Sequence, residues 1–98
     1  MGSRDEEARR PQLVWFFYVV RCSDSSLYAG ISTDVERRVK EHNCGNRGAK
    51  YTRGRRPVAL ARAEYPYSKG AALRRERWFK SLSKNKKELF LTENQGGI

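Results

Sequence analysis

One segment, Leu13–Val20, constrains the fold of this chain more than any other, because it holds eight consecutive apolar residues, most of them β-branched or aromatic. It is the longest apolar run, yet it is far shorter than the roughly 20 residues that a membrane-spanning helix needs. A strand with one face in water alternates polar and apolar residues, whereas a strand buried on both faces does not. The run therefore predicts a central strand over Leu13–Arg21 that other elements cover on both sides.

The turn-forming residues 23–26 separate this strand from Leu27–Ile31, which we expect to return as an antiparallel partner. A third strand is expected at Val58–Tyr65. Two helices should follow it, one over Lys69–Leu82 with Ser68 as its N-cap and a short one over Lys84–Leu91. Together with the helix described next, these elements indicate a single α/β unit.

The segment after the second strand carries a helix start signal. Thr33 is followed three residues later by Glu36, and this spacing is that of a capping box with Thr33 as the N-cap. The helix is expected to run to about Asn43 and to stop at Gly45. Residues 45–57 are basic and rich in glycine, and they predict a loop or a partly helical connection.

The chain has 98 residues, which is enough for one domain, expected over 13–92 with a flexible N-terminal tail at 1–12 and a C-terminal tail at 93–98. Its only cysteines, Cys22 and Cys44, are too few for a disulfide framework, and a zinc site built from them would lack ligands. We therefore expect two reduced thiols in a cytoplasmic protein.

The net charge of +10 is distributed unevenly along the chain. Residues 1–36 carry four basic and six acidic side chains, whereas 37–62 carry nine and one, and 69–88 carry eight and two. Such clustering favours a polyanionic partner, and nucleic acid fits best. An anionic membrane surface would require an amphipathic helix with a broad, bulky apolar face, which the chain lacks.

The helix after Thr33 places two polar residues beside its apolar stripe. Val35 and Val39 define the buried direction; His42 falls about 20° and Arg38 about 60° from Val35. Each residue alone has a structural interpretation. His42 can be a packed core residue, and Arg38 can extend its charged end from the apolar stripe into water. Their i, i+4 spacing on one face makes a functional pair an equally good interpretation.

Glu76 stands out on the helix after Ser68. It lies at the edge of the apolar face, about 40° from Ala72 and 60° from Phe79, and it is surrounded in sequence by lysine and arginine. An i, i+4 ion pair with Lys80 would account for it. The alternative is a carboxylate that cationic neighbours keep ionised and that holds a hard cation such as Mg²⁺.

These residues together resemble a known pattern. Phe16-Phe17-Tyr18 and, after nine residues, Tyr28-Ala29-Gly30 resemble the paired motif of the GIY-YIG nuclease superfamily, with Phe-Phe in place of Gly-Ile in the first triplet. Arg38 follows the motif glycine by eight residues, His42 comes four later, and Glu76 lies on the later helix. Segments 37–43, 48–58 and 72–76 are similar to the compact bacterial YhbQ-like group, so the resemblance covers about residues 14–90.

The resemblance implies a small three-stranded antiparallel sheet flanked by helices, an α+β fold, and hydrolysis of phosphodiester bonds with one divalent ion, Mg²⁺ or Mn²⁺. Glu76 would be the protein ligand of the metal, and Arg38 would bind the scissile phosphate. Tyr18 and Tyr28 would line the site, with one of them orienting or deprotonating the attacking water. His42 would assist that tyrosine or contact the phosphate. Where many members of the superfamily carry an asparagine, this chain has Glu88.

An aromatic residue among cations suits a splayed single strand or a distorted junction. The resemblance likewise points to single-stranded or structured DNA, cut by an endonuclease in DNA processing or repair, with a protein partner for targeting as an option. The alternative is a non-catalytic nucleic-acid-binding module that works with a partner. The residues expected to grip the substrate are Arg37, Lys50, Tyr51, Arg53, Arg55 and Arg56.

Overall fold

The computed structural model describes residues 14–95. Its core is a three-stranded antiparallel sheet with the spatial order β2-β1-β3, so the long apolar run forms the central strand, as predicted. Each strand lies within about two residues of its expected position: β1 at Trp15–Arg21, β2 at Leu27–Ser32 and β3 at Ala59–Tyr67.

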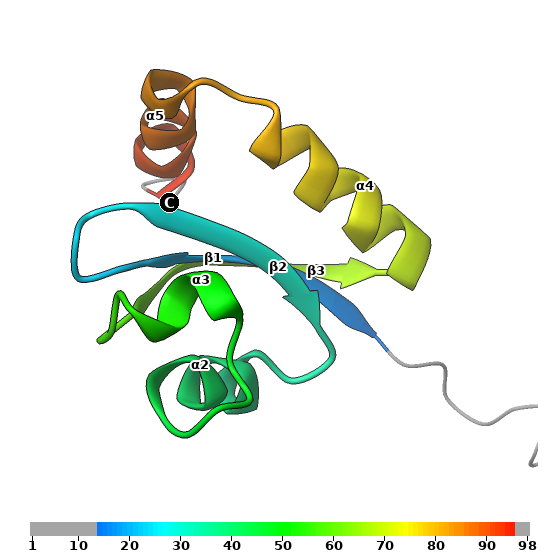
Figure 1. Ribbon diagram of the computed structural model, residues 1–98. Helices are drawn as coiled ribbons and strands as arrows, with labels where there is room; N and C mark the ends of the chain where they lie inside the picture. The colour runs from blue at the N-terminus through cyan, green and yellow to red at the C-terminus, as the bar shows by residue number, and fades with distance from the viewer. Residues whose placement is uncertain (1–13, 96–98) are drawn as a thin grey trace, which may run out of the picture.

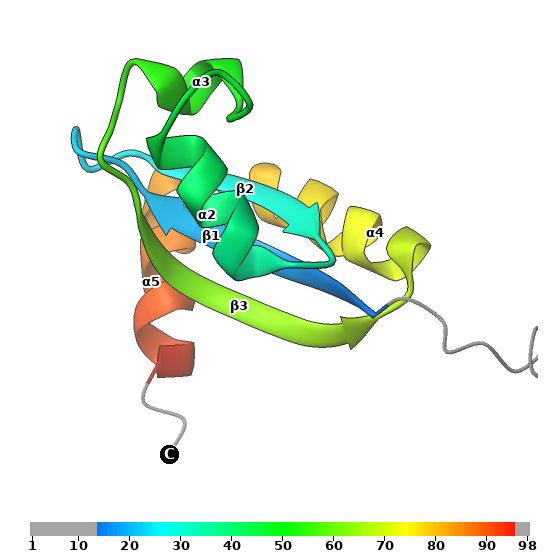
Figure 2. The same cartoon turned by 90° about the horizontal axis from the view of Figure 1, so that it is seen from below.

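Four helices cover the two faces of this sheet (Figure 1). One face carries α2 (Val35–Asn43) and the four-residue α3 (Lys50–Arg53), which makes the basic connection partly helical. The other face carries α4 (Lys69–Lys80) and α5 (Lys84–Gln95) (Figure 2). The α+β class and the covering of β1 on both sides are thus confirmed. The expected N-terminal tail lies outside the described residues, and α5 extends the helical region beyond the expected end at residue 92.

The helix caps are confirmed in one case and wrong in the other. Ser68 caps α4, because its hydroxyl accepts a hydrogen bond from the Ala71 backbone N–H at 3.1 Å. The cap of α2 is Asp34 and not Thr33: the Asp34 carboxylate accepts from the Arg37 N–H at 3.0 Å. Both residue types can cap, and Asp34 has the extended backbone of an N-cap, so the helix starts one residue later than the sequence suggested.

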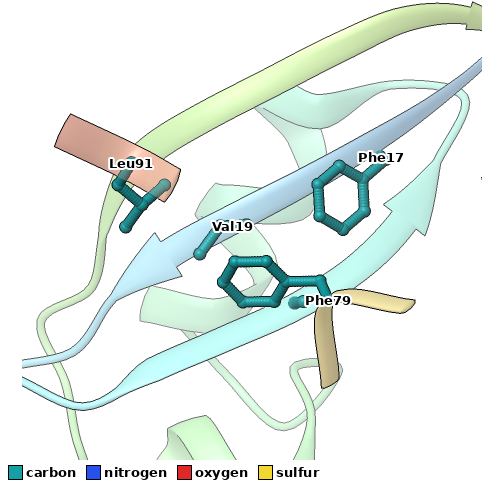
Figure 3. Packing of buried hydrophobic residues seen from close by; sticks show 5 residues of the cluster. Phe17, Val19, Phe79 and Leu91 are labelled. Carbon is teal, nitrogen blue, oxygen red and sulfur yellow. The ribbon is translucent and has the colours of Figure 1, made fainter. Parts of the chain in front are cut away.

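The face under α4 and α5 holds the apolar core. Phe17 and Val19 of β1 are fully buried there against Phe79 of α4 and Leu91 of α5 (Figure 3). The rings of Phe17 and Phe79 lie 5.7 Å apart in a tilted arrangement. This layer is almost purely hydrocarbon, so its contribution to the molecule is stability.

The opposite face, under α2 and α3, is packed differently. Tyr18 and Val20 of β1 are buried against Val35 and Val39 of α2, as the helix periodicity predicted. Buried polar side chains lie among them, including a fully buried histidine. None of the helices within residues 14–95 is long and apolar enough to cross a bilayer.

Candidate active site

The site is built around Tyr18, in the middle of the central strand. Tyr18 pairs with Gly30 on β2 and with Ala63 on β3, and its side chain is only 1% exposed. Its hydroxyl lies 2.8 Å from Nε2 of His42, which α2 brings to the same face of the sheet. The two residues that the sequence placed 24 positions apart are thus a buried hydrogen-bonded pair.

Gly30 allows the Tyr18 ring to lie where it does. A Cβ at position 30 would be 2.6 Å from the Tyr18 hydroxyl oxygen and 2.9 Å from the ring carbon that bears it. Real Cβ atoms do not approach so closely, so any side chain here would displace the phenol. The glycine of the second triplet is therefore required by a close approach to the tyrosine of the first.

A third buried residue, Thr52 of α3, completes this network, and the sequence analysis missed it. Its hydroxyl lies 2.8 Å from Nδ1 of His42 and 3.0 Å from the Ala49 carbonyl oxygen. The side chain is fully buried, although it belongs to a basic connection that looked like a surface loop. Gly48 permits this packing, because a Cβ there would be 2.8 Å from the His42 Cα.

Both rings of the Tyr18–His42 pair are neutral at neutral pH. Burial raises the pKa of Tyr18 to about 12, although the neighbouring Arg38 guanidinium acts in the opposite direction. Burial, assisted by the positive charge of Arg38, lowers the pKa of His42 to about 4. The imidazole therefore carries a single proton, and so does the phenol.

These protonation states set the direction of the hydrogen bonds. Arg38, the other polar neighbour of the Tyr18 hydroxyl, is purely a donor, so the phenol donates to Nε2 of His42. The imidazole proton then lies on Nδ1 and is donated to Thr52 Oγ1, and Thr52 donates to the Ala49 carbonyl. The Ala49 N–H, at 3.4 Å from Nδ1, is a longer and weaker contact.

Arg38 brings a positive charge to this pair from α2. Its Nη1 donates to the Glu41 carboxylate and to the Arg47 carbonyl, each at 2.9 Å, and its side chain is 26% exposed. The guanidinium is thus held in place by its own helix and by the following loop, while it remains open to a ligand.

Tyr28 and Glu76 complete the predicted set along the β2 edge of the sheet. Tyr28 meets the His42 ring edge-on, with centroids 5.3 Å apart, and stacks on Tyr51 at 5.8 Å. On the other side of Tyr28, the Lys80 amine lies 5.7 Å from its ring and 2.5 Å from the Glu76 carboxylate. The ion pair between Glu76 and Lys80 that the spacing suggested is therefore present.

The five predicted catalytic residues are near neighbours, although they come from four elements. Burial raises the pKa of Tyr18 most strongly, and the neighbouring Tyr28 and Glu76 raise it further. The structure thus places Tyr28, Arg38, His42 and Glu76 around Tyr18 of the central strand.

The residues expected to grip nucleic acid divide into two groups. Lys50, Tyr51 and Arg53 are exposed on α3, and the Arg55 guanidinium lies 3.9 Å above the Tyr51 ring while it pairs with Asp24 at 3.0 Å. Arg56 is used by the fold instead: its guanidinium donates to the carbonyl oxygens of His42 and Gly45, each at 2.6 Å. Arg37 is exposed and lies 3.7 Å from Glu41.

Glu76 is the residue that fits a divalent metal. Within the described part of the chain, no three histidine, cysteine or acidic side chains cluster as a closed metal site would require. The Glu76 side chain is 18% exposed and is bonded, among described residues, to Lys80 alone. Mg²⁺ keeps several waters and takes one or two carboxylates together with substrate phosphates, so a single glutamate beside an open edge suits it.

Comparison with known proteins shows the family to which this chain belongs. The family model of the GIY-YIG catalytic domain matches residues 14–88. The match covers most of the chain, so this protein belongs to the GIY-YIG catalytic domain family, and membership supports a nuclease-type role. The resemblance noted in the sequence is thereby confirmed.

Within that family, the chain is similar to UPF0213 proteins. It is 52% identical to one from Natronomonas pharaonis, over 83% of this chain and 94% of that protein. It is 51% identical to YazA of Bacillus subtilis, over 82% of this chain and 80% of that protein. The solution structure of a UPF0213 protein from Bacillus halodurans has 44% identity and a TM-score of 0.52, covering 80% of this chain and 82% of that one.

Proposed function

We propose that this protein is a divalent-metal-dependent endonuclease that hydrolyses phosphodiester bonds of single-stranded or structured DNA, in DNA processing or repair. The observation that carries the proposal is the placement of Glu76 beside Tyr28 and within electrostatic range of Tyr18, among basic side chains. A surface that only binds DNA gains nothing from a carboxylate in its midst, because the carboxylate repels the phosphates.

Arg38 is the residue that would receive the scissile phosphate. Its planar guanidinium matches two phosphate oxygens, and charge develops on those oxygens in the transition state. Glu41 and the Arg47 carbonyl hold the guanidinium in place before substrate arrives. The positioning is therefore built into the free protein, and little reorganisation is needed during the reaction.

Tyr18 and His42 would handle the proton of the attacking water. In the free protein both have unfavourable pKa values for this task, because the phenol is hard to ionise and the imidazole is hard to protonate. A phosphate on Arg38 would cancel part of the positive charge that lowers the His42 pKa. Water can then give its proton to the Tyr18 oxygen as the phenol passes its own proton to Nε2, while the water oxygen bonds to phosphorus. The bond to the leaving oxygen breaks, and that oxygen takes a proton from solvent.

Glu76 would hold the metal ion, with Tyr28 lining the space between it and His42. When bound, the ion supplies Lewis-acid stabilisation of phosphate charge. Thr52 would act as a positioning residue, because its bond to Nδ1 keeps Nε2 of His42 available as the acceptor for Tyr18.

The test is cleavage of end-labelled single-stranded, duplex and branched DNA, with Mg²⁺, with Mn²⁺ and with EDTA. We expect metal-dependent cutting of the single-stranded or branched substrates. Glu76→Ala, prepared in parallel, should remove cleavage and preserve or strengthen DNA binding, since a carboxylate is removed from a basic surface. Cleavage that survives in Glu76→Ala would show that the metal assignment is wrong.

The second candidate function, a non-catalytic DNA-binding module, is favoured by the exposed basic residues of α3 together with the stacked pair Tyr28–Tyr51. It predicts binding without cutting on every substrate and with every metal. That outcome would overturn the enzyme proposal.

A further inference from the structure

A cavity of about 250 Å³ lies next to the candidate active site, between the β1–β2 turn and the first turns of α5. The turn, α3 and α5 are grouped at the same end of the molecule in both views (Figures 1 and 2). The cavity is lined by Asp24, Ser25, Ser26, Leu27, Tyr51, Lys84, Lys87 and Glu88. Of these residues, only Tyr51 belongs to the set that the sequence assigned to substrate binding.

The cavity is a continuation of the active-site edge. Its wall includes Leu27, which directly precedes Tyr28 on β2, and Tyr51, which stacks on Tyr28. The Lys80 amine lies over the opposite side of the Tyr28 ring, only a few residues before Lys84 along the chain. A nucleic-acid strand with one phosphate at Arg38 and Glu76 can therefore extend along β2 toward the cavity.

The charges in the cavity favour an anion. Both of its carboxylates already have arginine partners: Asp24 pairs with Arg55 at 3.0 Å, and Glu88 pairs with Arg21 through both oxygens, at 2.8 and 2.9 Å. Neither lysine forms an ion pair among residues 14–95: Lys84 acts on the pKa of Glu88 more weakly than Arg21 does, and the Lys87 amine lies 5.7 Å from the Phe79 ring. The cavity thus presents two cations that are open to a ligand beside neutralised acids.

We propose that this cavity, which we call the hairpin subsite, binds the phosphate of a nucleotide that flanks the scissile phosphate on a single DNA strand. The proposal rests on the proposed nuclease function, and it gives the second basic stretch of the sequence a role. Lys84 and Lys87 supply the charge, and the stacked rings of Tyr28 and Tyr51 fix the path of the strand between the two phosphates.

The test compares Lys84→Gln/Lys87→Gln with Lys86→Gln. Lys86 is on the same helix but lines a different surface depression, with Trp78 and Leu89, so it controls for the general loss of positive charge. Binding of a fluorescein-labelled single-stranded oligonucleotide is measured by anisotropy in EDTA, over a series of salt concentrations. Because EDTA prevents metal-dependent cutting, the measurement does not depend on catalysis.

We expect the double variant to bind the oligonucleotide about tenfold more weakly than the unaltered protein. The slope of log affinity against log salt concentration should flatten by about 0.7 for each phosphate that the protein no longer neutralises. Lys86→Gln should bind within about twofold of the unaltered protein. Equal weakening in both variants, or unchanged binding in the double variant, would overturn the hairpin subsite. If the unaltered protein does not bind the oligonucleotide, both the subsite and the nuclease proposal are overturned.

A second arm separates a DNA phosphate from a free one. Inorganic phosphate is titrated while the Ser25 and Ser26 amide resonances are followed by NMR, and the oligonucleotide is titrated in the same way. The subsite is supported if the oligonucleotide shifts these resonances more than inorganic phosphate does and if the shifts are absent in the double variant. If millimolar inorganic phosphate alone saturates the shifts, the cavity is not a site for a DNA strand. If the double variant loses DNA binding as expected but Glu76→Ala still cleaves DNA normally, the metal assignment of Glu76 is overturned and the hairpin subsite is not.

Discussion

The two faces of the central strand are built from alternate residues of the same segment, yet one face packs apolar side chains and the other buries hydrogen-bonded polar ones. On one face, Phe17 and Val19 meet Phe79 and Leu91 in a layer of hydrocarbon. On the other face, the same strand places Tyr18 against a polar network. The first face is stabilised mainly by packing, with one ion-pair network around Glu64 beside it, whereas the second depends on a chain of single hydrogen bonds.

This difference separates stability from chemistry. The apolar face gains free energy from burial, which does not depend on the orientation of any one atom. The polar face holds a neutral phenol, a neutral imidazole and a hydroxyl, each of which must find its partner inside the protein. The free energy spent on burying these groups is compensated by their mutual hydrogen bonds, and the arrangement fixes the Tyr18 oxygen beside Arg38.

The largest effect on stability is expected from Phe79→Ala on the apolar face. Removing this fully buried ring should lower the free energy of unfolding by about 3–5 kcal/mol. The cleavage rate per folded molecule should stay within about threefold, since Phe79 is not one of the five candidate catalytic residues. Urea denaturation and cleavage assays below the transition measure both, with the exposed Leu73→Ala on the same helix as the control. A small stability change, or a selective loss of cleavage, would contradict the division between the faces.

The pH dependence of stability near neutral pH sharpens the comparison, because the buried histidine lies on the polar face. The folded-state pKa of His42 is about 4, below the ordinary value of 6.5, so the unfolded chain takes up a proton first as pH falls. The stabilisation from the neutral imidazole is present above pH 6.5 and is lost between pH 6.5 and 4, on the order of 3 kcal/mol in all.

NMR titration of His42, the single histidine of the chain, gives its folded-state pKa directly. Urea denaturation of the unaltered protein and of His42→Asn, at pH 7 and pH 5, gives the accompanying loss of stability. The unaltered protein should lose about 2 kcal/mol more than the variant over this interval. A folded-state pKa near 6.5 would contradict the buried neutral imidazole.

A smaller effect on stability is expected from Thr52→Val, which removes the acceptor of the His42 Nδ1 proton at constant shape. The free energy of unfolding should fall by about 1–3 kcal/mol, and kcat by about tenfold with little change in KM. Nitrogen-15 NMR of the imidazole should show the proton on Nδ1 in the unaltered protein and partly on Nε2 in the variant. Thr52→Ser should restore the Nδ1 proton. A proton on Nε2 in the unaltered protein would contradict the direction assigned to the network.

The sequence was sufficient to predict the fold class and the covering of the central strand on both faces. Successive side chains of a strand point to opposite faces, and the spacing of Val35, Val39 and His42 puts them on one side of a helix. Both rules depend on local geometry, and the structure places these residues as that geometry requires. The site residues were added by resemblance, and the structure brings them together without testing their roles.

What the sequence could not show depends on contacts between distant segments. Thr52 is buried only because Gly48 lets the connection pack against the end of α2, and no local pattern marks a threonine in such a segment as buried. Glu88 forms two hydrogen bonds to Arg21, and these bonds join residues 67 positions apart. Neither contact has a signal in composition or periodicity.

The most direct test of the central claim compares two glutamates, one on the β3 edge of the sheet and one beside the β2 edge. Glu64 of β3 is nearly buried, and although burial raises its pKa, hydrogen bonds from Arg75, Arg62 and Tyr67 hold that pKa below its ordinary value. Glu76 lies at the active-site edge with Lys80. Both are changed to glutamine, and cleavage of labelled single-stranded DNA is measured alongside thermal unfolding.

We predict that Glu76→Gln slows cleavage on the order of a thousandfold, since loss of Lewis-acid stabilisation amounts to several kcal/mol. Its stability should change by no more than about 0.5 kcal/mol. Glu64→Gln should lower stability by about 1–3 kcal/mol and keep its cleavage rate below the melting transition. Retained cleavage in Glu76→Gln, or equal loss of cleavage in the two variants, would contradict the claim that Glu76 serves the chemistry while Glu64 serves stability.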